Sequence, residues 1–173
     1  MLCFYLWKAS IWCHRHGFRL GARFFKTLTF FGWGALLEPE AELEGHVNFS
    51  HRGLGVTVHG TTTIGDWAQI YQHVMIGSNN DKDAPVRHGV RIGRGVVLGA
   101  YAIVMCPMGR SITIGDRAVI GAGAIVTDDV PPGGLVLPEP SKIVGIRKDM
   151  RDQDGTAPTA PATAAPPRGD LQS

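Results

Sequence analysis

The sequence predicts an all-β solenoid, a parallel β-helix built from stacked coils. An aliphatic residue recurs at every sixth position over much of the chain, and this period fits neither an α-helix nor a flat strand. Three such six-residue units form one coil of about 18 residues. The recurring residues are Val58, Ile64, Ile70, Ile76, Ile92, Leu98, Val104, Ile114, Ile120 and Val126.

The residues that follow each aliphatic position also repeat. Glycine comes next in Ile64-Gly65, Ile92-Gly93, Ile114-Gly115 and Ile120-Gly121, and a small residue stands at the fifth position of these units. We expect the aliphatic side chains to fill a narrow triangular core and Gly or Asp to turn the corner. The small residue then allows coils to stack at the strand spacing of about 4.8 Å.

The repeat is interrupted at three places, where loops are expected to leave the wall. Before the first break the register runs through Leu37, Leu43 and Phe49, and it slips by three residues across 52–55. A long excursion separates Ile76 from Ile92, and a shorter one covers 106–111. Such loops commonly carry function in repeat proteins.

The chain divides into a helical segment (1–35), the β-helix (36–147) and a disordered tail (148–173). Residues 1–34 combine five Lys or Arg residues with ten aromatic residues and contain no Asp or Glu. We expect this segment to pack on the open end of the solenoid; contact with an anionic membrane or with a protein partner are the alternatives. The tail is rich in Ala, Pro and Thr and is too poor in large apolar residues to fold.

Composition excludes several classes of function. The formal net charge of the 173 residues is +2, which gives no support for a nucleic-acid partner. The spacing of Cys3, Cys13 and Cys106 suggests neither a disulfide framework nor a zinc knuckle. We therefore expect a cytoplasmic protein, with peripheral attachment to the inner face of the membrane as a variant.

Histidine is the side chain best suited to catalysis here. His51 occupies the third position of the unit that begins at Phe49, directly before the register slip, where the wall opens and a hydroxyl group can reach it. A neutral imidazole, with an ordinary pKa of about 6.5, accepts a proton near neutral pH. His51 is therefore the leading candidate for a general base.

The segment 49–58, followed by Ile64-Gly65-Asp66 and 70–77, resembles serine O-acetyltransferases and the related exopolysaccharide acetyltransferases. These are hexapeptide-repeat acyltransferases with a left-handed β-helix, and the resemblance covers about residues 37–145. It implies that His51 is the general base and acetyl-CoA the co-substrate. It also implies a homotrimer with active sites between neighbouring solenoids, and no metal.

Two departures from the serine enzymes concern the acceptor. An Asp fifteen residues before the histidine orients the imidazole in that family, and the Asp directly before the histidine helps to hold serine; here these positions are Leu36 and Ser50. A saccharide or polysaccharide precursor is therefore the favoured acceptor, and serine is the alternative. Glu38 is a candidate replacement for the orienting Asp, although a backbone carbonyl or a simple solvated charge fits equally well.

Other site residues follow from the resemblance. Ser50, Arg87 and His88 are expected near the acceptor. Ala102 and Ala124 match small wall residues beside the pantetheine arm, although simple coil stacking explains them as well. Lys142 lies in a segment similar to the closing loop of the family and is expected to offer its charge to a phosphate of CoA.

Two alternatives belong to other classes of protein. His46 and His51 have the spacing of zinc ligands in hexapeptide-repeat carbonic anhydrases, with His59, His73 or His88 as a third ligand. A binding scaffold without activity is the other. The favoured hypothesis remains an acetyl-CoA-dependent O-acetyltransferase.

Overall fold

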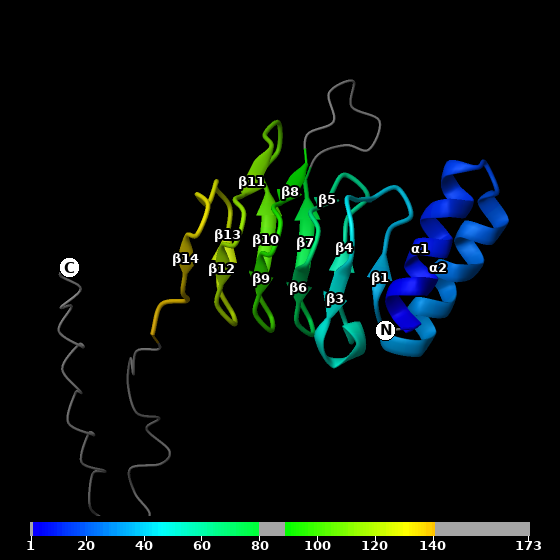
Figure 1. Ribbon diagram of the computed structural model, residues 1–173, viewed down its shortest axis with the longest axis horizontal. Helices are drawn as coiled ribbons and strands as arrows, with labels where there is room; N and C mark the ends of the chain where they lie inside the picture. The colour runs from blue at the N-terminus through cyan, green and yellow to red at the C-terminus, as the bar shows by residue number, and fades with distance from the viewer. Residues whose placement is uncertain (1, 80–88, 141–173) are drawn as a thin grey trace, which may run out of the picture. The chain divides into compact units, whose positions relative to one another are not determined.

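The computed structural model describes residues 2–79 and 89–140, and residues Met1–Glu139 form one compact unit. Two helices come first in this unit, α1 (Leu2–Arg15) and α2 (Arg19–Trp33). Short parallel strands follow, arranged side by side in successive layers (Figure 1).

The strands belong to three parallel sheets that the chain visits in turn, which is the topology of a β-helix. In order across each sheet, sheet A contains β1 (Leu36–Leu37), β4 (Thr57–Val58), β7 (Met75–Ser78), β10 (Ile103–Cys106) and β13 (Ile125–Val126). Sheet B contains β2 (Glu42–Leu43), β5 (Thr63–Ile64), β8 (Val90–Ile92) and β11 (Ile112–Ile114). Sheet C contains β3 (Val47–Phe49), β6 (Ala68–Ile70), β9 (Val97–Leu98), β12 (Val119–Ile120) and β14 (Leu135–Val136). The predicted all-β solenoid is confirmed.

The strand register agrees with the six-residue repeat. In sheet A, Leu37 pairs with Val58, Val58 with Ile76, Ile76 with Val104, and Val104 with Val126. The pairing of Leu37 with Val58 absorbs the three-residue slip, and the pairing of Ile64 with Ile92 in sheet B crosses the long excursion. Because the strands on either side of each interruption pair with the same neighbours as in a regular coil, the extra residues form loops outside the wall. The stacking of the coils is unchanged.

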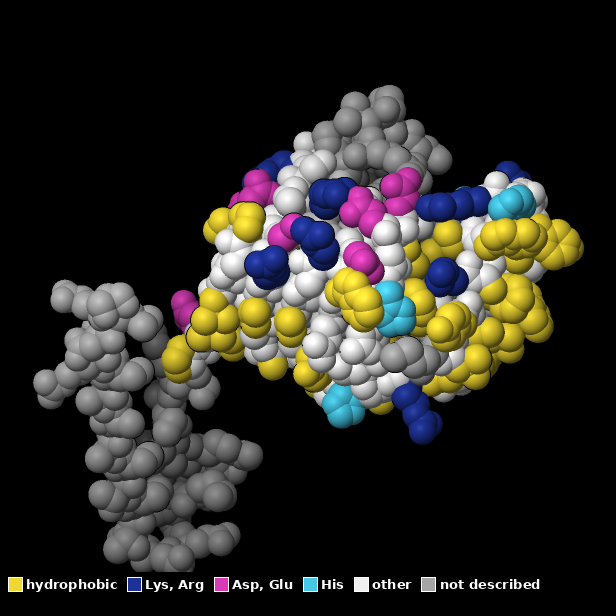
Figure 2. All heavy atoms as spheres, in the orientation of Figure 1, with side chains coloured by type: hydrophobic (Ala, Val, Ile, Leu, Met, Phe, Trp, Pro, Cys, Tyr) yellow, Lys and Arg dark blue, Asp and Glu magenta, His cyan; other side chains and the backbone are white. Residues whose placement is uncertain are grey.

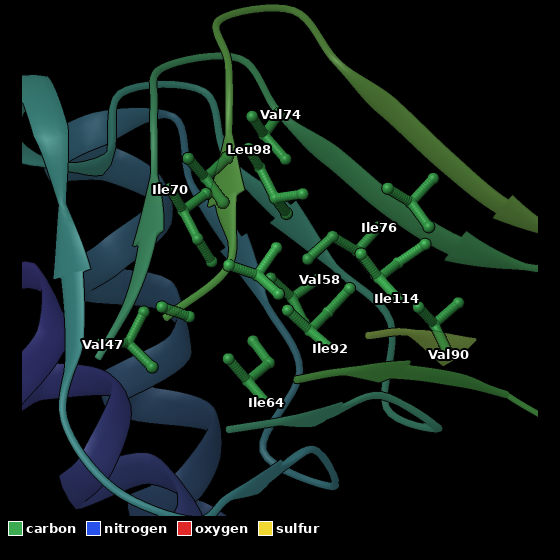
Figure 3. Packing of buried hydrophobic residues seen from close by; sticks show 14 of the residues in the cluster. Val47, Val58, Ile64, Ile70, Val74, Ile76, Val90, Ile92, Leu98 and Ile114 are labelled. Carbon is green, nitrogen blue, oxygen red and sulfur yellow. The ribbon is translucent and has the colours of Figure 1, made fainter. Parts of the chain in front are cut away.

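The aliphatic side chains of the repeat fill the interior. Figure 3 shows Val58, Ile64, Ile70, Ile76 and Ile92 gathered between the sheets, and each is fully buried. Burying an Ile or Val side chain contributes roughly 1.5–3 kcal/mol, so a stack of such residues accounts for much of the stability of a narrow solenoid.

The glycines that follow the aliphatic positions have a different role from the one expected. A Cβ atom on Gly65 would lie 2.7 Å from the carbonyl carbon of Gly93 in the next coil. The left-handed backbone of the turn lies two residues further on, at Trp67 (φ 60°) and Gly95 (φ 66°). The expectation that these glycines turn the corner is therefore wrong; they are required because the backbones of adjacent coils approach closely.

The aspartates do act at the corner, as expected. The Oδ1 atom of Asp66 accepts hydrogen bonds from the amides of His46, 2.7 Å away in the preceding coil, and of Trp67, 3.0 Å away. Asp116 repeats the contact to the preceding coil by accepting a hydrogen bond from the amide of Arg94 at 2.9 Å. Each Asp thus links two successive coils.

The two helices close the N-terminal end of the solenoid. Trp7 is fully buried, its Nε1 atom donates a hydrogen bond to the carbonyl oxygen of Glu38 at 3.0 Å, and its ring lies 6.0 Å from that of Phe49. The amide of Gly55 donates to the carbonyl oxygen of Trp33 at 2.9 Å. The expected packing of helices on the open end is therefore observed. Of the helices in the described residues, none is long and apolar enough to cross a membrane.

Candidate functional site

His51 lies at the corner where the chain passes from sheet C to sheet A. It belongs to the short 3-10 segment η1 (Ser50–Gly53), which follows β3 and contains the register slip. His51 (φ 50°) and Arg52 (φ 62°) both adopt the left-handed conformation, which costs an ordinary residue about 1–2 kcal/mol. Both side chains are exposed, so this strained turn presents the imidazole to the outside of the coil.

A hydrogen-bonded group of three polar side chains lies near His51. The Nε2 atom of Gln69 donates hydrogen bonds to the Oγ of Ser50 at 3.3 Å and to the hydroxyl of Tyr71 at 3.2 Å. The ring centroid of Tyr71 lies 6.3 Å from that of His51. Ser50, Gln69 and Tyr71 present hydroxyl and amide groups, so they offer hydrogen bonds to an acceptor but no carboxylate or ammonium partner.

Gln69 and Tyr71 were missed from the sequence, although a signal was present. They flank the buried Ile70 in β6, so strand alternation directs both side chains outward. The pairing of β3 with β6 places Asn48 beside Gln69 and Phe49 beside Ile70, and continuing this register brings Ser50 next to Tyr71. Reading one coil ahead of His51 would have found them.

An aromatic pair continues the same corner into the next coils. The rings of His73 and Tyr101 are stacked, with centroids 4.7 Å apart and planes 17° apart. Both residues have left-handed backbones, as have Gly55 before them and Gly123 after them. A Cβ atom on Gly55 would collide with the His73 ring, so glycine is required there for the imidazole to lie against the wall.

Glu38 and His51 lie at opposite ends of the strands of sheet A. His51 precedes β4, whereas Glu38 follows β1, and the strands of this sheet are parallel. The Oε2 atom of Glu38 forms an ion pair with the Nζ of Lys26 in α2 at 2.7 Å, largely shielded from solvent. Within one chain the structure therefore separates His51 from Glu38, which was a candidate to orient it, and ties Glu38 to the helices.

The structure buries the side chains of Ala102 and Ala124 in the solenoid. Both residues lie at the corner between sheets C and A, one above the other in successive coils. The amide of Met75 donates a hydrogen bond to the carbonyl of Ala102, and the amide of Ile103 donates one to the carbonyl of Ala124. This location favours the coil-stacking explanation for both side chains. Arg87, His88 and Lys142 lie outside the described residues.

The outer face of sheet A carries a shallow hollow of about 210 Å³. Leu36, Met75 and Met105 contribute apolar side chains to its lining, and Glu38, His59 and Ser78 contribute polar groups. This mixture of apolar and polar groups suits an alkyl chain that carries a few polar atoms.

Comparisons with known proteins agree with this architecture. The model of the family "Hexapeptide repeat of succinyl-transferase" matches residues 89–128. Serine acetyltransferase of Synechococcus elongatus is 30% identical over 122 residues, which is 69% of this chain and 47% of that protein. The chain is a hexapeptide-repeat, left-handed β-helix similar to serine acetyltransferases.

Further relatives of this hexapeptide-repeat chain carry the same name. Probable serine acetyltransferase 2 of Oryza sativa subsp. japonica is 34% identical over 116 residues, which is 67% of this chain and 30% of that protein. Soybean serine acetyltransferase complexed with serine superposes with a TM-score of 0.69 at 28% identity, covering 83% of this chain and 56% of that chain. This chain thus spans about half the length, or less, of these relatives.

The zinc hypothesis for this hexapeptide-repeat chain gains no support from the described residues. His46 precedes β3 and packs against Phe4, with ring centroids 4.8 Å apart, whereas His51 follows β3. The two histidines therefore lie at different corners of the coil. Within residues 2–79 and 89–140, no three His, Cys, Asp or Glu side chains gather as a metal site would require.

Proposed function

We propose that this chain is an acetyl-CoA-dependent O-acetyltransferase in which His51 is the general base. The observation that carries the proposal is the exposed imidazole of His51, held at a coil corner by a left-handed turn. The hydroxyl groups of Ser50 and Tyr71 and the amide of Gln69 lie around it and suit a hydroxylated acceptor. The similarity to serine acetyltransferases supports the acetyl group and the thioester donor.

In the proposed reaction, acetyl-CoA supplies the activated acyl group and the chain supplies the base. An imidazole nitrogen of His51 takes the proton from the acceptor hydroxyl as that oxygen bonds to the thioester carbonyl carbon. The carbon–sulfur bond then breaks, the acetyl ester is released, and the departing CoA sulfur receives the proton from His51. A positioned base of this kind contributes about 10²–10⁴ in rate.

The apolar hollow on sheet A supports a place for the slender arm of CoA. Its lining by Leu36, Met75 and Met105 suits the alkyl part of pantetheine, and the groups at the rim suit its amides. Phosphate binding by Lys142 and assembly into a homotrimer, with sites between neighbouring chains, remain predictions. Assembly would bring groups of a neighbouring chain to the site at His51.

Serine is the acceptor that the comparisons favour, in preference to the saccharide favoured by the sequence alone. Two relatives at 30% and 34% identity are named serine acetyltransferases, and the soybean protein was solved with serine. A saccharide hydroxyl stays as the second candidate because neither of two positions near the site holds a carboxylate. Ser50 stands directly before His51, and the partly exposed Leu36 begins β1. A site without a paired carboxylate holds an ammonium group weakly.

The test combines the full chain with acetyl-CoA and a panel of acceptors. Free thiol is followed with time and the acetylated product is identified by mass spectrometry. L-Alanine, which lacks the hydroxyl of L-serine, is the matched negative acceptor, and hexoses and amino sugars test the second candidate. Thiol release with L-serine but not L-alanine supports the first candidate, and release only with sugars supports the second. Release at the rate of spontaneous hydrolysis with every acceptor contradicts the proposed function.

A further inference from the structure

Helix α2 directs its large apolar side chains outward. Its buried residues are small, namely Gly21, Ala22 and Thr29, and the hydroxyl of Ser10 in α1 donates a hydrogen bond to the carbonyl of Ala22 at 2.9 Å. Four of the exposed apolar residues of α2 form a stripe along the helix: Leu20, Phe24, Leu28 and Phe31. Leu20 is 76% exposed and Phe31 is 81% exposed. An ordinary surface helix shows the reverse arrangement, with its apolar stripe toward the core.

Helix α1 adds to the same kind of surface. Phe4, Trp7 and Ile11 are buried against the solenoid, while other large apolar residues of this helix remain exposed. We define the cap face as the exposed large apolar residues of the two helices and their junction: Leu2, Tyr5, Trp12, Phe18, Leu20, Phe24, Leu28, Phe30 and Phe31. Figure 2 shows hydrophobic side chains gathered over the helical end of the unit. Exposed apolar surface on this scale marks an interaction site.

The charged side chains of the two helices are all basic, and Glu40 of the solenoid lines a hollow beside Arg19 and Arg23. Lys8, Arg15, Arg19 and Arg23 are exposed on the two helices, and residues 1–34 contain no Asp or Glu. Lys26, the remaining cation, forms its ion pair with Glu38 at the edge of the solenoid. The cap face therefore combines aromatic side chains with excess positive charge.

We propose that the cap face binds to the surface of an anionic membrane, with α1 and α2 lying in the interfacial plane. Aromatic and aliphatic side chains enter the boundary of the acyl chains, and the arginines pair with lipid phosphates. A hollow of about 480 Å³ fits this role, because Arg23 lies there beside Phe30 and Phe31. A second copy of the chain fits less well, because a two-fold contact would bring the cations of one cap face against those of the other.

The test is co-sedimentation of the full chain with vesicles of phosphatidylcholine alone or mixed with phosphatidylglycerol. We expect binding to the anionic vesicles that weakens between 0.1 M and 0.5 M salt, because the Debye length shortens. The Arg19→Gln/Arg23→Gln variant should bind about 30-fold more weakly, as two phosphate-pairing charges are lost. The Phe24→Ser/Phe31→Ser variant should lose about 10-fold or more, since buried phenyl surface is removed.

Matched controls on the solenoid separate the cap face from surface properties in general. Ile125→Ser/Leu135→Ser removes two apolar side chains of similar exposure, and Arg94→Gln/Arg117→Gln removes two exposed charges. Both controls should bind anionic vesicles as the unmodified chain does, and circular dichroism should show that all variants are folded. Equal binding to neutral vesicles, or cap variants that bind like the controls, would overturn the proposal. The proposal would also be overturned if the unmodified chain did not bind vesicles and the cap variants had a lower mass in sedimentation equilibrium. That result would show that the cap face joins copies of the chain.

Discussion

The close approach of the coils makes Gly93→Ala the most informative change for the fold. A Cβ atom on Gly93 would lie 2.7 Å from the amide nitrogen of Asp116 and 2.9 Å from the carbonyl carbon of Gly115. These two neighbours are backbone atoms of the next coil, and the nearest atom, 2.6 Å away, is the Oδ1 of Asp116, which accepts a hydrogen bond from the amide of Arg94. That coil is fixed in turn, because the amide of Gly93 donates a hydrogen bond to the carbonyl of Ile114 at 2.8 Å.

The added methyl group can be accommodated only if the carboxylate of Asp116 and the backbone of the next coil both move away. Overpacking of this kind costs typically about 1–3 kcal/mol, and the upper part of that range is expected because two of the three crowded neighbours are backbone atoms. The free energy of unfolding, measured in urea at one fixed protein concentration, should fall by that amount.

Two other glycines serve as controls that separate crowding from backbone conformation. A Cβ atom on Gly32, in α2, meets nothing within 4 Å, so Gly32→Ala should be neutral or stabilising by about 0.5–1 kcal/mol. Gly123 also faces open space but has a φ of 73°, so its replacement by Ala should cost about 1–2 kcal/mol from conformation alone. A Gly93→Ala variant as stable as Gly32→Ala would refute the account of coil spacing.

Three further changes test other parts of the structure. Ile92→Asp buries an unpaired carboxylate and should prevent soluble folding, whereas Ile125→Asp, on the exposed face, should stay folded; soluble, folded Ile92→Asp would contradict the register. Trp7→Phe removes the hydrogen bond to the Glu38 carbonyl and should lower the free energy of unfolding by about 0.5–1.5 kcal/mol; no change in urea unfolding would argue against this link between helix and solenoid. Burial raises the pKa of Cys3 to about 11 from 9.0, so the unfolded chain releases this proton at lower pH and stability should fall between pH 9 and 11. Alkylation of Cys3 by iodoacetamide at pH 9, followed by peptide mass spectrometry, should be slow until urea unfolds the chain, and equal rates would exclude a buried thiol.

The coil register could be predicted because each inward position of the repeat meets the same environment. Val58, Ile76 and Val104 occupy one column of the core, so the same side-chain type recurs wherever the chain returns to it. The slip and the excursions were visible as breaks in that recurrence. Their closure into a single stack follows from the pairing of strands on either side.

Outward-facing residues carry no such recurrence, and the site was predicted less completely for that reason. Gln69 and Tyr71 reach Ser50 and His51 only through the pairing of adjacent coils. Glu38 is near His51 in sequence, but the two residues lie at opposite ends of the strands of sheet A. The ion-pair partner of Glu38 is Lys26, which lies in a helix. The role of the repeat glycines was misassigned because close approach of two backbones and a left-handed turn both select glycine.

The measurement that tests the central claim most directly is the turnover of His51→Ala with acetyl-CoA and the best acceptor of the panel. Because the imidazole is exposed, the change should leave the thermal unfolding temperature and the binding of acetyl-CoA nearly unchanged while turnover falls about 10²-fold or more. His14→Ala, which removes an exposed imidazole from the end of α1, is the matched control and should turn over normally. A His51→Ala variant with turnover close to that of His14→Ala would contradict the assignment of His51 as the base.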